Sequence, residues 1–405
     1  MDDAMFNSGD TAWVLISAAL VLFMTPGLAF FYGGMVRARH VLGMLMQNIF
    51  AMGIISVLWS AIGYSLAFGG SNSIVGDASH LFLSGLTDDG SIPTMAFVAF
   101  QMMFAVITPA LITGATADRL RFGSYALLIA IWSVVVYAPV ARWVWNADGW
   151  IYAMGSLDFA GGAAIHINAG VAALAVVMVI GPRKGHGAEP MPPHNLPFTV
   201  LGTGILWFGW IGFNAGSALA ANGIAAQAVV NTHLAAAAGM LAWLLIERVK
   251  TGHATTLGAA SGAVAGLVAV TPCAGFIGDA SPLIIGAIAG ALCYLSLGLK
   301  GRLKVDDSLD VIAVHLVGGL VGTVLLGFFA DTSVNADGFD GMFFGGGGEL
   351  LKDQIVAAVA VMAFSFVVTW VIAQAIQRTI GLRVSESDEL TGLDQSVHSE
   401  SAYQA

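Results

Sequence analysis

The chain has 405 residues, of which 57% are hydrophobic and only 10% are charged, with a net charge of −10 at pH 7. Soluble globular domains average about 25% charged residues, so this composition excludes an ordinary soluble protein. The two cysteines, Cys273 and Cys293, form no spaced framework, which argues against a disulfide scaffold or a cysteine-based metal site. Long hydrophobic runs and 51 glycines instead predict an all-α polytopic membrane protein, surrounded by membrane lipid, whose helices approach through small residues.

We predict eleven membrane-spanning helices and a tail. In chain order the helices are Trp13–Val36, Val41–Phe68, Thr94–Thr116, Phe122–Val140, Phe159–Gly181, Leu196–Gly216, Ala225–Ile246, Leu257–Ile277, Pro282–Leu299, Leu309–Phe329 and Ile355–Ile376. Residues 1–378 then form one transmembrane domain, and residues 379–405 form a polar, acidic cytoplasmic tail that would become ordered only by docking. The first residues, Met1-Asp2-Asp3, are acidic where a signal peptide is basic, so we expect no cleavable signal.

The basic residues predict the orientation in the membrane. With the N-terminus outside, all of the 15 Lys and Arg residues except Arg142 and Lys352 fall on the cytoplasmic side, in the loops carrying Arg37 and Arg39, Arg119 and Arg121, Arg183 and Lys184, Arg248 and Lys250, Lys300, Arg302 and Lys304, and after the last helix at Arg378 and Arg383. The positive-inside rule therefore predicts an outside N-terminus and an inside C-terminus, which requires an odd number of spans.

Two spans carry a histidine in a segment otherwise suited to hydrocarbon. His166 lies in LDFAGGAAIHINAGVAAL, which begins next to Asp158, and His315 lies in VIAVHLVGGLVG, directly after Asp310. An ionisable side chain within a membrane helix is costly and by default indicates a pathway or relay. Because the fifth and tenth spans enter from opposite sides, we predict an inverted repeat of five plus five helices, with function at the midplane and the eleventh helix outside the repeat.

Each histidine has a structural alternative, since it could simply bridge two helices. Two at symmetric positions favour a shared role, because a neutral imidazole can accept a proton at one ring nitrogen and donate one from the other. We interpret His233, which has no equivalent, as structural. Capping of a helix N-terminus explains Asp310, whereas Asp158 could also hold a cation site in shape without touching the cation. With no carboxylate or thiol near the histidines and no lysine in mid-span, we expect neither a metal site nor a retinal Schiff base.

Aromatic residues gather toward the outer ends of the third, fourth and sixth spans. Phe104, Trp145 and Phe213 could be ordinary core residues, or could form a cage for a small cation with Ser217 as hydrogen-bond acceptor. Such a cage contributes about 0.5–2 kcal/mol, whereas an unpaired ion in an apolar pore costs on the order of tens of kcal/mol. No ring of carboxylates or carbonyl filter offsets that cost. A species that binds as a cation and crosses as a neutral molecule would resolve the conflict, and ammonium is one.

Several stretches are similar to a known family. They are TPGLAFFYGGMVRARHVLGMLMQN from Thr25, FQMMFAVITPALITGATADRLRF from Phe100, LDFAGGAAIHINAG from Leu157, LPFTVLGTGILWFGWIGFNAGSA from Leu196, LGAASGAVAGLVAVTPCAGF from Leu257, DDSLDVIAVHLVGGLVG from Asp306, and the tail GLRVSESDELTGLDQSVHSESAY. Together they resemble the ammonium transporter (Amt/Mep/Rh) family over nearly the whole chain. Trp145 and the TPCAGF stretch favour its Amt branch over the Rh branch.

The resemblance implies a homotrimer with a separate pore in each subunit. It implies that Trp145, Phe104 and Ser217 recruit ammonium, supported structurally by Asp158; that Phe104 and Phe213 form a gate; that His166 and His315 are twin histidines of a hydrophobic pore; and that Trp210 and Thr271 line the pore nearby. It also implies ammonium or methylammonium as substrate, no cofactor, metal or catalytic residue, and nitrogen uptake across a prokaryotic plasma (inner) membrane.

A PII-type signalling trimer (GlnK) on the cytoplasmic face is a plausible regulator by the same resemblance, and no nucleic-acid partner is expected. We therefore expect an ammonium transporter that recruits NH4+ outside, removes a proton and conducts NH3 inward, with or without that proton. Alternatives are an ammonium sensor and an Rh-like channel for a neutral gas. An enzyme has little support, because no nucleophile motif, phosphate-binding loop or metal cluster is present.

Overall fold

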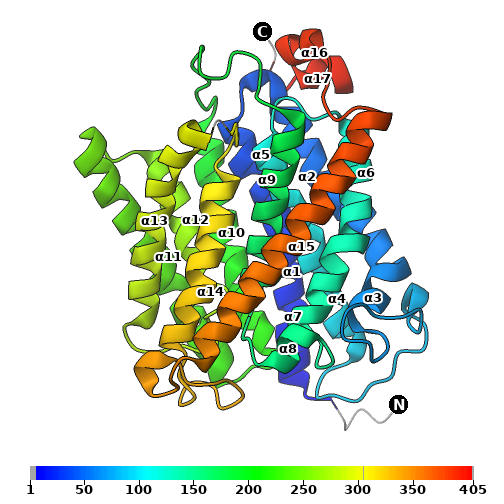
Figure 1. Ribbon diagram of the computed structural model, residues 1–405, viewed down its shortest axis with the longest axis vertical. Coiled ribbons are helices and arrows are strands. Elements are labelled where there is room, and N and C mark those ends of the chain that lie inside the picture. Colours follow the sequence, from blue (N-terminus) through cyan, green and yellow to red (C-terminus); the bar gives the residue numbers. More distant parts are fainter. Residues whose placement is uncertain (1–5, 304, 404–405) are drawn as a thin grey trace.

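Long apolar helices running side by side form the molecule in the computed structural model, which describes residues 6–303 and 305–403 (Figure 1). Within those residues, ten helices are long and apolar enough to cross a membrane, and Thr256–Val270 is a shorter apolar helix. The two ends of the chain lie at opposite ends of the bundle. We call the end that carries loops 69–93, 146–161, 271–280 and 330–348 the N face, and the end that carries the C-terminal tail the C face.

The helices follow the predicted order. They are α1 (Ser8–Met35), α2 (Val41–Leu58), α3 (Tyr64–Phe68), α4 (Thr94–Leu111), α5 (Thr113–Thr116), α6 (Phe122–Trp132), α7 (Ala138–Trp145), α8 (Trp150–Met154), α9 (Asn168–Ile180), α10 (Leu196–Ala215), α11 (Gly223–Thr251), α12 (Thr256–Val270), α13 (Ser281–Leu303), α14 (Gly318–Phe329), α15 (Glu349–Thr379), α16 (Glu386–Thr391) and α17 (Leu393–His398). Single-turn 3-10 segments are η1 (Ala38–His40), η3 (Leu81–Leu83), η6 (Gly216–Ala218) and η8 (Met342–Phe344).

Four π-helical segments interrupt or begin the long helices: η2 (Trp59–Gly63), η4 (Ser133–Tyr137), η5 (Gly162–Ile167) and η7 (Ile312–Val317). The segments η2 and η4 join α2 to α3 and α6 to α7 without ending the span. The segments η5 and η7 begin the two spans that carry His166 and His315. Such bulges are frequent at functional sites because they re-aim the side chains that follow.

Several predicted helix ends are wrong. The eleventh helix begins at Glu349 rather than Ile355, and α11 continues to Thr251 rather than Ile246, because polar residues outside the apolar belt still form intrahelical hydrogen bonds. By contrast, α12 ends at Val270 rather than Ile277. Thr271 still has helical backbone angles, but Pro272 after it has no backbone N–H to continue the helical hydrogen bonds.

Small residues allow the helices to pack backbone to backbone. A Cβ at Gly202 of α10 would lie 2.2 Å from the backbone nitrogen of Phe31 on α1, and one at Gly290 of α13 would lie 2.2 Å from the carbonyl oxygen of Gly239 on α11. Both distances are shorter than any real carbon contact. These glycines are therefore needed for the close crossings that membrane helices use in place of a hydrophobic driving force.

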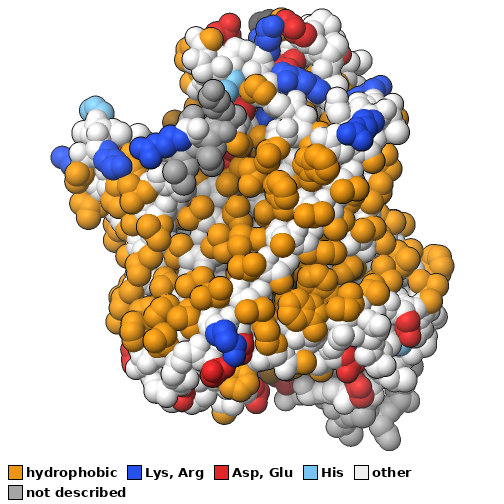
Figure 2. All heavy atoms as spheres, in the orientation of Figure 1, with side chains coloured by type: hydrophobic (Ala, Val, Ile, Leu, Met, Phe, Trp, Pro, Cys, Tyr) orange, Lys and Arg blue, Asp and Glu red, His pale blue; other side chains and the backbone are white. Residues whose placement is uncertain are grey.

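Charge is segregated between the two ends of the molecule, and an apolar belt lies between them (Figure 2). In this view most Lys and Arg side chains lie at the C face, whereas acidic side chains outnumber basic ones at the N face. Lys352 lies near the start of α15, where it pairs with Glu349. Arg142, the other predicted exception, is buried and donates to the carbonyls of Gly69, Gly70 and Asn72. It thus anchors a loop and adds no exposed charge. Lys304 lies outside the described residues.

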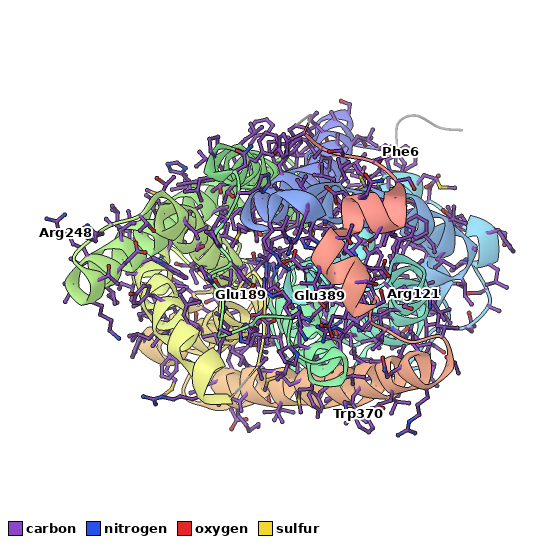
Figure 3. The ribbon with its side chains drawn as sticks, turned by 90° about the horizontal axis from the view of Figure 1, so that it is seen from above. Phe6, Arg121, Glu189, Arg248, Trp370 and Glu389 are labelled. Atoms are coloured by element: carbon purple, nitrogen blue, oxygen red, sulfur yellow. The ribbon has the colours of Figure 1, made fainter. Side chains whose placement is uncertain are left out.

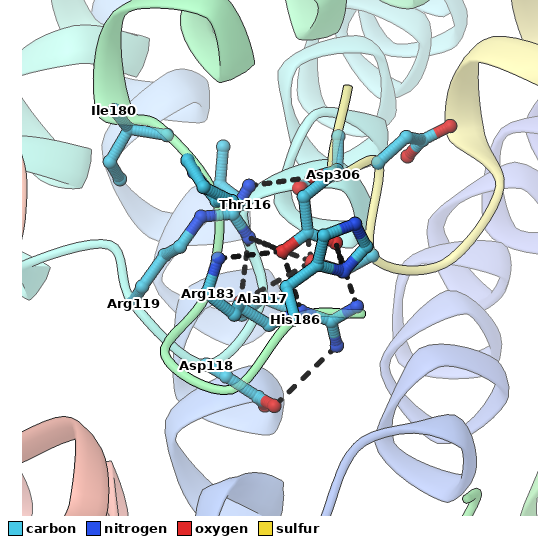
Figure 4. A network of polar contacts seen from close by, with 12 residues as sticks. Thr116, Ala117, Asp118, Arg119, Ile180, Arg183, His186 and Asp306 are labelled. Atoms are coloured by element: carbon cyan, nitrogen blue, oxygen red, sulfur yellow. Dashed lines mark hydrogen bonds and ion pairs between the residues drawn. The ribbon is translucent and has the colours of Figure 1, made fainter. Parts of the chain in front are cut away.

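A buried polar network ties the loops of the C face together (Figure 4). The carboxylate of Asp306 accepts from the Arg183 side chain at 2.8 and 3.0 Å and lies 3.9 Å from Arg119. Asp118 pairs with Arg37 at 2.9 Å. Arg119 is fully buried and also donates to the carbonyls of Gly181 and Asp306.

As far as Tyr403, the tail is placed and docks on the C face beside this network. Glu389 of α16 is buried near the middle of the C face, whereas Arg248 lies at its margin (Figure 3). The Glu389 carboxylate accepts from the Arg383 side chain at 2.7 Å and from the Lys184 backbone at 2.6 Å. Asp394 of α17 accepts from the backbone of Gly43 at 2.9 Å. The expectation that the tail is ordered by docking agrees with these contacts.

Candidate functional site

A vestibule opens at the N face. Its volume is about 450 Å³, and its lining includes Trp145, Ser217 and Asp158 together with residues of the distant loop 330–348, namely Asn335, Asp337 and Phe339. The long connection between α14 and α15 folds back over the ends of α7 and α10 to complete this cavity. Sequence reasoning missed these loop residues because nothing in a loop's composition indicates which helix ends it covers.

Two phenylalanines lie next to Trp145, which itself lines the vestibule. The ring centroids of Phe104 and Phe213 are 4.4 Å apart, and Phe104 meets Trp145 edge-to-face at 5.9 Å. Both phenylalanines are buried, whereas Trp145 is only partly buried and donates its indole N–H to the Asp158 carbonyl at 3.0 Å. The Ser217 hydroxyl donates to the Phe213 carbonyl at 3.0 Å, which leaves its oxygen available as an acceptor. The structure therefore brings together all four residues that were predicted to form a cage.

The two histidines meet directly below these rings. Nδ1 of His166 lies 3.2 Å from Nδ1 of His315, and the imidazoles are nearly parallel at an angle of 22°. One Nδ1 must carry the proton and donate it, and the other must accept it. The tautomer of each ring therefore depends on the tautomer of the other. Both are buried, and Nε2 of His166 has no hydrogen-bond partner among the described residues.

A narrow apolar cavity runs past the histidine pair. Its lining comprises the two imidazoles and Met24, Leu28, Phe31, Ile107, Leu111, Ile165, Leu206, Trp210, Phe213 and Val264. Its volume of about 10 Å³ is close to that of a single water position. Phe213 lines this cavity from above, so the pair of phenylalanines separates it from the vestibule. No lining side chain carries a full charge apart from a histidine that gains a proton.

Trp210 and Thr271, both expected to line the pore, are joined by a hydrogen bond. The Trp210 indole donates to the Thr271 hydroxyl at 2.9 Å, and that hydroxyl donates to the Leu267 carbonyl at 2.8 Å. Trp210 also stacks against the His166 ring at 5.5 Å. The bond between α10 and the end of α12 thus holds an indole face against one member of the pair. Thr271 itself is not among the residues that line the narrow cavity.

Asp158 caps the segment that carries His166. Its two carboxylate oxygens accept four backbone N–H groups, those of Gly161, Gly162, Ala163 and Ala164, at 2.6–3.1 Å. Four N–H groups at a helix start have no partner within the helix, and here one buried carboxylate satisfies them. With all of its acceptor directions occupied by backbone, Asp158 supports the shape of the site.

The prediction that Asp310 caps the second histidine segment is wrong. Asp307 accepts the N–H groups of Val311 and Ile312 at 3.1 and 2.7 Å, while Asp310 adopts φ +65° and contacts Lys300. Asp307 lies eight residues before His315 (315 − 307), just as Asp158 lies eight before His166 (166 − 158). Each capping aspartate precedes a six-residue π segment. The equal spacing to the histidine was therefore the sequence signal that could have identified Asp307 as the cap.

His233 lies away from the pair, on α11. Its ring is exposed on the surface of the chain and meets Trp207 at 5.4 Å. It is not part of the lining of the narrow cavity. Within residues 6–303 and 305–403, no group of three or more His, Cys, Asp or Glu side chains converges in a way that could hold a metal ion.

The fold and its surface define a multi-pass membrane protein with a vestibule at one end and a buried histidine pair inside. The model of the Ammonium Transporter Family matches residues 12–403. An ammonium transporter of Mycobacterium tuberculosis (strain H37Rv) is 50% identical over 98% of this chain and 90% of its own length. This chain therefore belongs to the ammonium transporter family.

Solved structures agree with that membership. Mep2 of Candida albicans superposes with a TM-score of 0.90 at 35% sequence identity, over 95% of this chain and 88% of Mep2. A structure described as a sensor Amt protein matches with the same TM-score of 0.90 at 27% identity, over 98% of this chain and 99% of that one.

Proposed function

We propose that this protein is a channel-like ammonium transporter that takes up NH4+ at the vestibule and conducts NH3 past the histidine pair into the cytoplasm. The contact between His166 and His315 beneath the Phe104–Phe213 pair carries the proposal. The histidine pair lines the narrow apolar cavity, which suits a neutral molecule, whereas the vestibule above it suits a cation. The family membership and the names of the relatives support the same substrate.

The chemistry follows from the two environments. At the inner end of the vestibule, Trp145, with Phe104 packed behind it, attracts a small cation by cation–π interaction worth about 0.5–2 kcal/mol, and the Ser217 oxygen accepts one of its hydrogen bonds. Below the phenylalanines no side chain offsets the cost of burying the ion, so the substrate continues as NH3 and gives up a proton, which either returns to water in the vestibule or follows through the His166–His315 pair. In the narrow cavity, NH3 can form a hydrogen bond with Nε2 of His166, which has no other partner among the described residues.

Transport current would test this proposal. We would reconstitute the protein on a solid-supported membrane and step the ammonium concentration at fixed pH, comparing the parent with the His166→Leu/His315→Leu double variant. A saturable current that is lost in the double variant is expected. His233→Leu is the matched control, because it removes a membrane histidine outside the lumen and should leave the current intact. An unchanged current in the double variant would refute the role of the pair.

The same preparation separates the alternatives. Alkalinisation of the vesicle interior without current would indicate net NH3 conduction, as in a neutral gas channel. Ammonium binding without current or alkalinisation would favour a sensor. Competition by methylammonium is expected for the proposed transporter.

We further propose that the chain works as a homotrimer in a prokaryotic plasma membrane, with its N-terminus outside, its C-terminus in the cytoplasm and its two five-helix halves inverted. The eight-residue spacing from Asp158 to His166 and from Asp307 to His315 supports the inverted halves, and the basic C face supports the orientation. A PII-type trimer would then contact the C face. Native mass measurement in detergent is expected to give three chains per particle, and a monomer would refute the assembly.

A further inference from the structure

A second cavity of about 440 Å³ lies at the N face, outside the vestibule. Its walls come from α3, from the start of α4 and from the loop between them, and Leu219 is the one residue shared with the vestibule lining. The transport proposal makes no use of this cavity. Its chemistry is defined by three aromatic rings, Tyr64, Phe68 and Phe97, and by Asp89 and His80 on the loop.

The rings stand at angles to one another and so form separate walls. The Phe68 and Phe97 rings are 5.0 Å apart at 78°, and those of Tyr64 and Phe68 are 5.4 Å apart at 36°. Trp59 packs against Tyr64 at 5.9 Å and Phe68 at 6.3 Å, which supports both rings from outside the cavity. Tyr64 is buried and the two phenylalanines are half-buried, so the rings are held in place and still reach the cavity.

The polar part of the lining is negative. Asp89 is exposed, and no ion pair engages it among the described residues. No Lys or Arg is among the residues that line the cavity. Nδ1 of His80 lies 3.1 Å from the Ser84 carbonyl and donates to it, which fixes the ring against the loop. Asp88, next to Asp89, caps the start of α4 through the Thr94 N–H at 2.8 Å and so positions the loop.

We propose that this cavity binds an alkylammonium group. The negative faces of aromatic rings attract a cation, and a methylated ammonium is favoured because it loses little hydration when the rings surround it. Asp89, an exposed carboxylate of the lining, supplies the counter-charge. The group could belong to a free amine or to the ethanolamine or choline headgroup of a lipid.

Equilibrium binding of radiolabelled tetramethylammonium to the purified full-length protein tests the proposal. Saturable binding is expected to persist in Trp145→Leu, which disables the vestibule site. Asp89→Asn should weaken it about threefold. Phe97→Leu should weaken it about fivefold or more through the lost ring face. Asp279→Asn removes the same charge from an exposed N-face residue outside the cavity and should change nothing.

Two outcomes would overturn the proposal: loss of all binding in Trp145→Leu, or equal affinity in the parent, Asp89→Asn and Phe97→Leu at matched melting temperatures. Repeating the titration in nanodiscs of phosphatidylglycerol, with and without phosphatidylethanolamine, identifies the source of the group. Weaker tetramethylammonium binding when phosphatidylethanolamine is present would assign a lipid headgroup, and equal binding a free amine. Because binding rather than flux is measured, failure here leaves the transport proposal standing.

Discussion

Gly170 shows how one missing side chain sets the distance between the two histidines. A Cβ at Gly170 on α9 would lie 2.5 Å from the backbone nitrogen of Leu316, the residue after His315. The helices that carry the pair cross at this point. Any side chain here must push the two segments apart, whatever its intrinsic helix propensity.

We therefore expect Gly170→Ala to lower the melting temperature and to reduce ammonium transport strongly. Overpacking of this kind costs about 1–3 kcal/mol. Gly204→Ala is the matched control, because nothing lies within 4 Å of its added Cβ. It should leave transport unchanged and raise stability slightly, since Ala favours a helix over Gly by about 1 kcal/mol. Equal effects of the two substitutions, measured by thermal melting and flux, would contradict the packing argument.

A second residue-scale prediction concerns Asp158. Asp158→Ala leaves four N–H groups without an acceptor, and each unsatisfied buried group costs about 1–3 kcal/mol. Asp158→Asn keeps one oxygen and should lose less. We expect the melting temperature to fall in the order parent, Asn, Ala, with transport falling in parallel. Loss of transport in Asp158→Asn at an unchanged melting temperature would instead indicate that the carboxylate acts on the substrate directly.

Two neighbouring carboxyls at the start of the second histidine segment have pKa values that are shifted in opposite directions. Burial alone would raise the pKa of Asp306, but hydrogen bonds from Arg183 and the charge of Arg119 lower this pKa to about 2. Burial raises the pKa of Asp307 to about 6, although Lys300 opposes this. Asp306 therefore stabilises the fold above about pH 4, and its contribution is lost as the pH falls toward 2. For Asp307, ionisation costs stability as the pH rises from about 4 to 6.

The two Asn variants should separate these effects in melting curves taken from pH 4 to pH 8. Asp306→Asn is expected to be less stable than the parent throughout this range. Asp307→Asn keeps one oxygen as an acceptor for the cap. As the pH rises from 4 to 6, its free energy of unfolding should increase relative to that of the parent, by up to about 3 kcal/mol. A gain that failed to level off above pH 6, or that had the opposite sign, would contradict the raised pKa of Asp307.

At the scale of elements, the tail depends on one buried carboxylate. Glu389 joins α16 to Arg383 and to the loop at Lys184, whereas Glu386 on the same helix makes an exposed pair with the Lys184 side chain at 2.7 Å. Removing one partner of a buried pair costs about 3–5 kcal/mol, whereas an exposed pair contributes about 0–1 kcal/mol. The two glutamates thus make a matched comparison.

Glu389→Gln should release the tail and Glu386→Gln should not. Hydrogen exchange across residues 386–398 would measure the release, because docked backbone is protected and free backbone is not. We expect faster exchange only in Glu389→Gln. Equal protection in both variants would mean that other contacts, such as Asp394 with Gly43, hold the tail.

At the scale of the whole molecule, the charged ends and the apolar belt predict the orientation. Cysteines placed at two exposed alanines, Ala336 on the N face and Ala254 on the C face, test it. A membrane-impermeant maleimide applied to intact cells should label Ala336→Cys at once and Ala254→Cys only after permeabilisation. The parent is the control, because Cys273 and Cys293 are both buried. The reverse labelling pattern would refute the outside N-terminus.

The sequence by itself determined the class of protein, the order of its helices, and the histidines and aromatic residues of the candidate site, but not the loop residues of the vestibule. Membrane spans are local, since hydrocarbon requires about 20 apolar residues in one helix. The histidines stood out because ionisable groups are costly in such spans. Other meetings of distant groups were not predicted. The cap of the second histidine segment proved to be Asp307, and Arg142 proved to be an interior anchor.

Tertiary structure alone decided the geometry that function depends on. The 3.2 Å contact of His166 with His315 requires Gly170 to pack against Leu316, and the vestibule is lined jointly by Trp145 and by the distant loop at Phe339. These are contacts between segments more than a hundred residues apart, chosen by packing and by the pairing of buried polar groups. Local periodicity carries no record of them. The sequence therefore names the chemical groups, and the packing of helices places them within reach of one another.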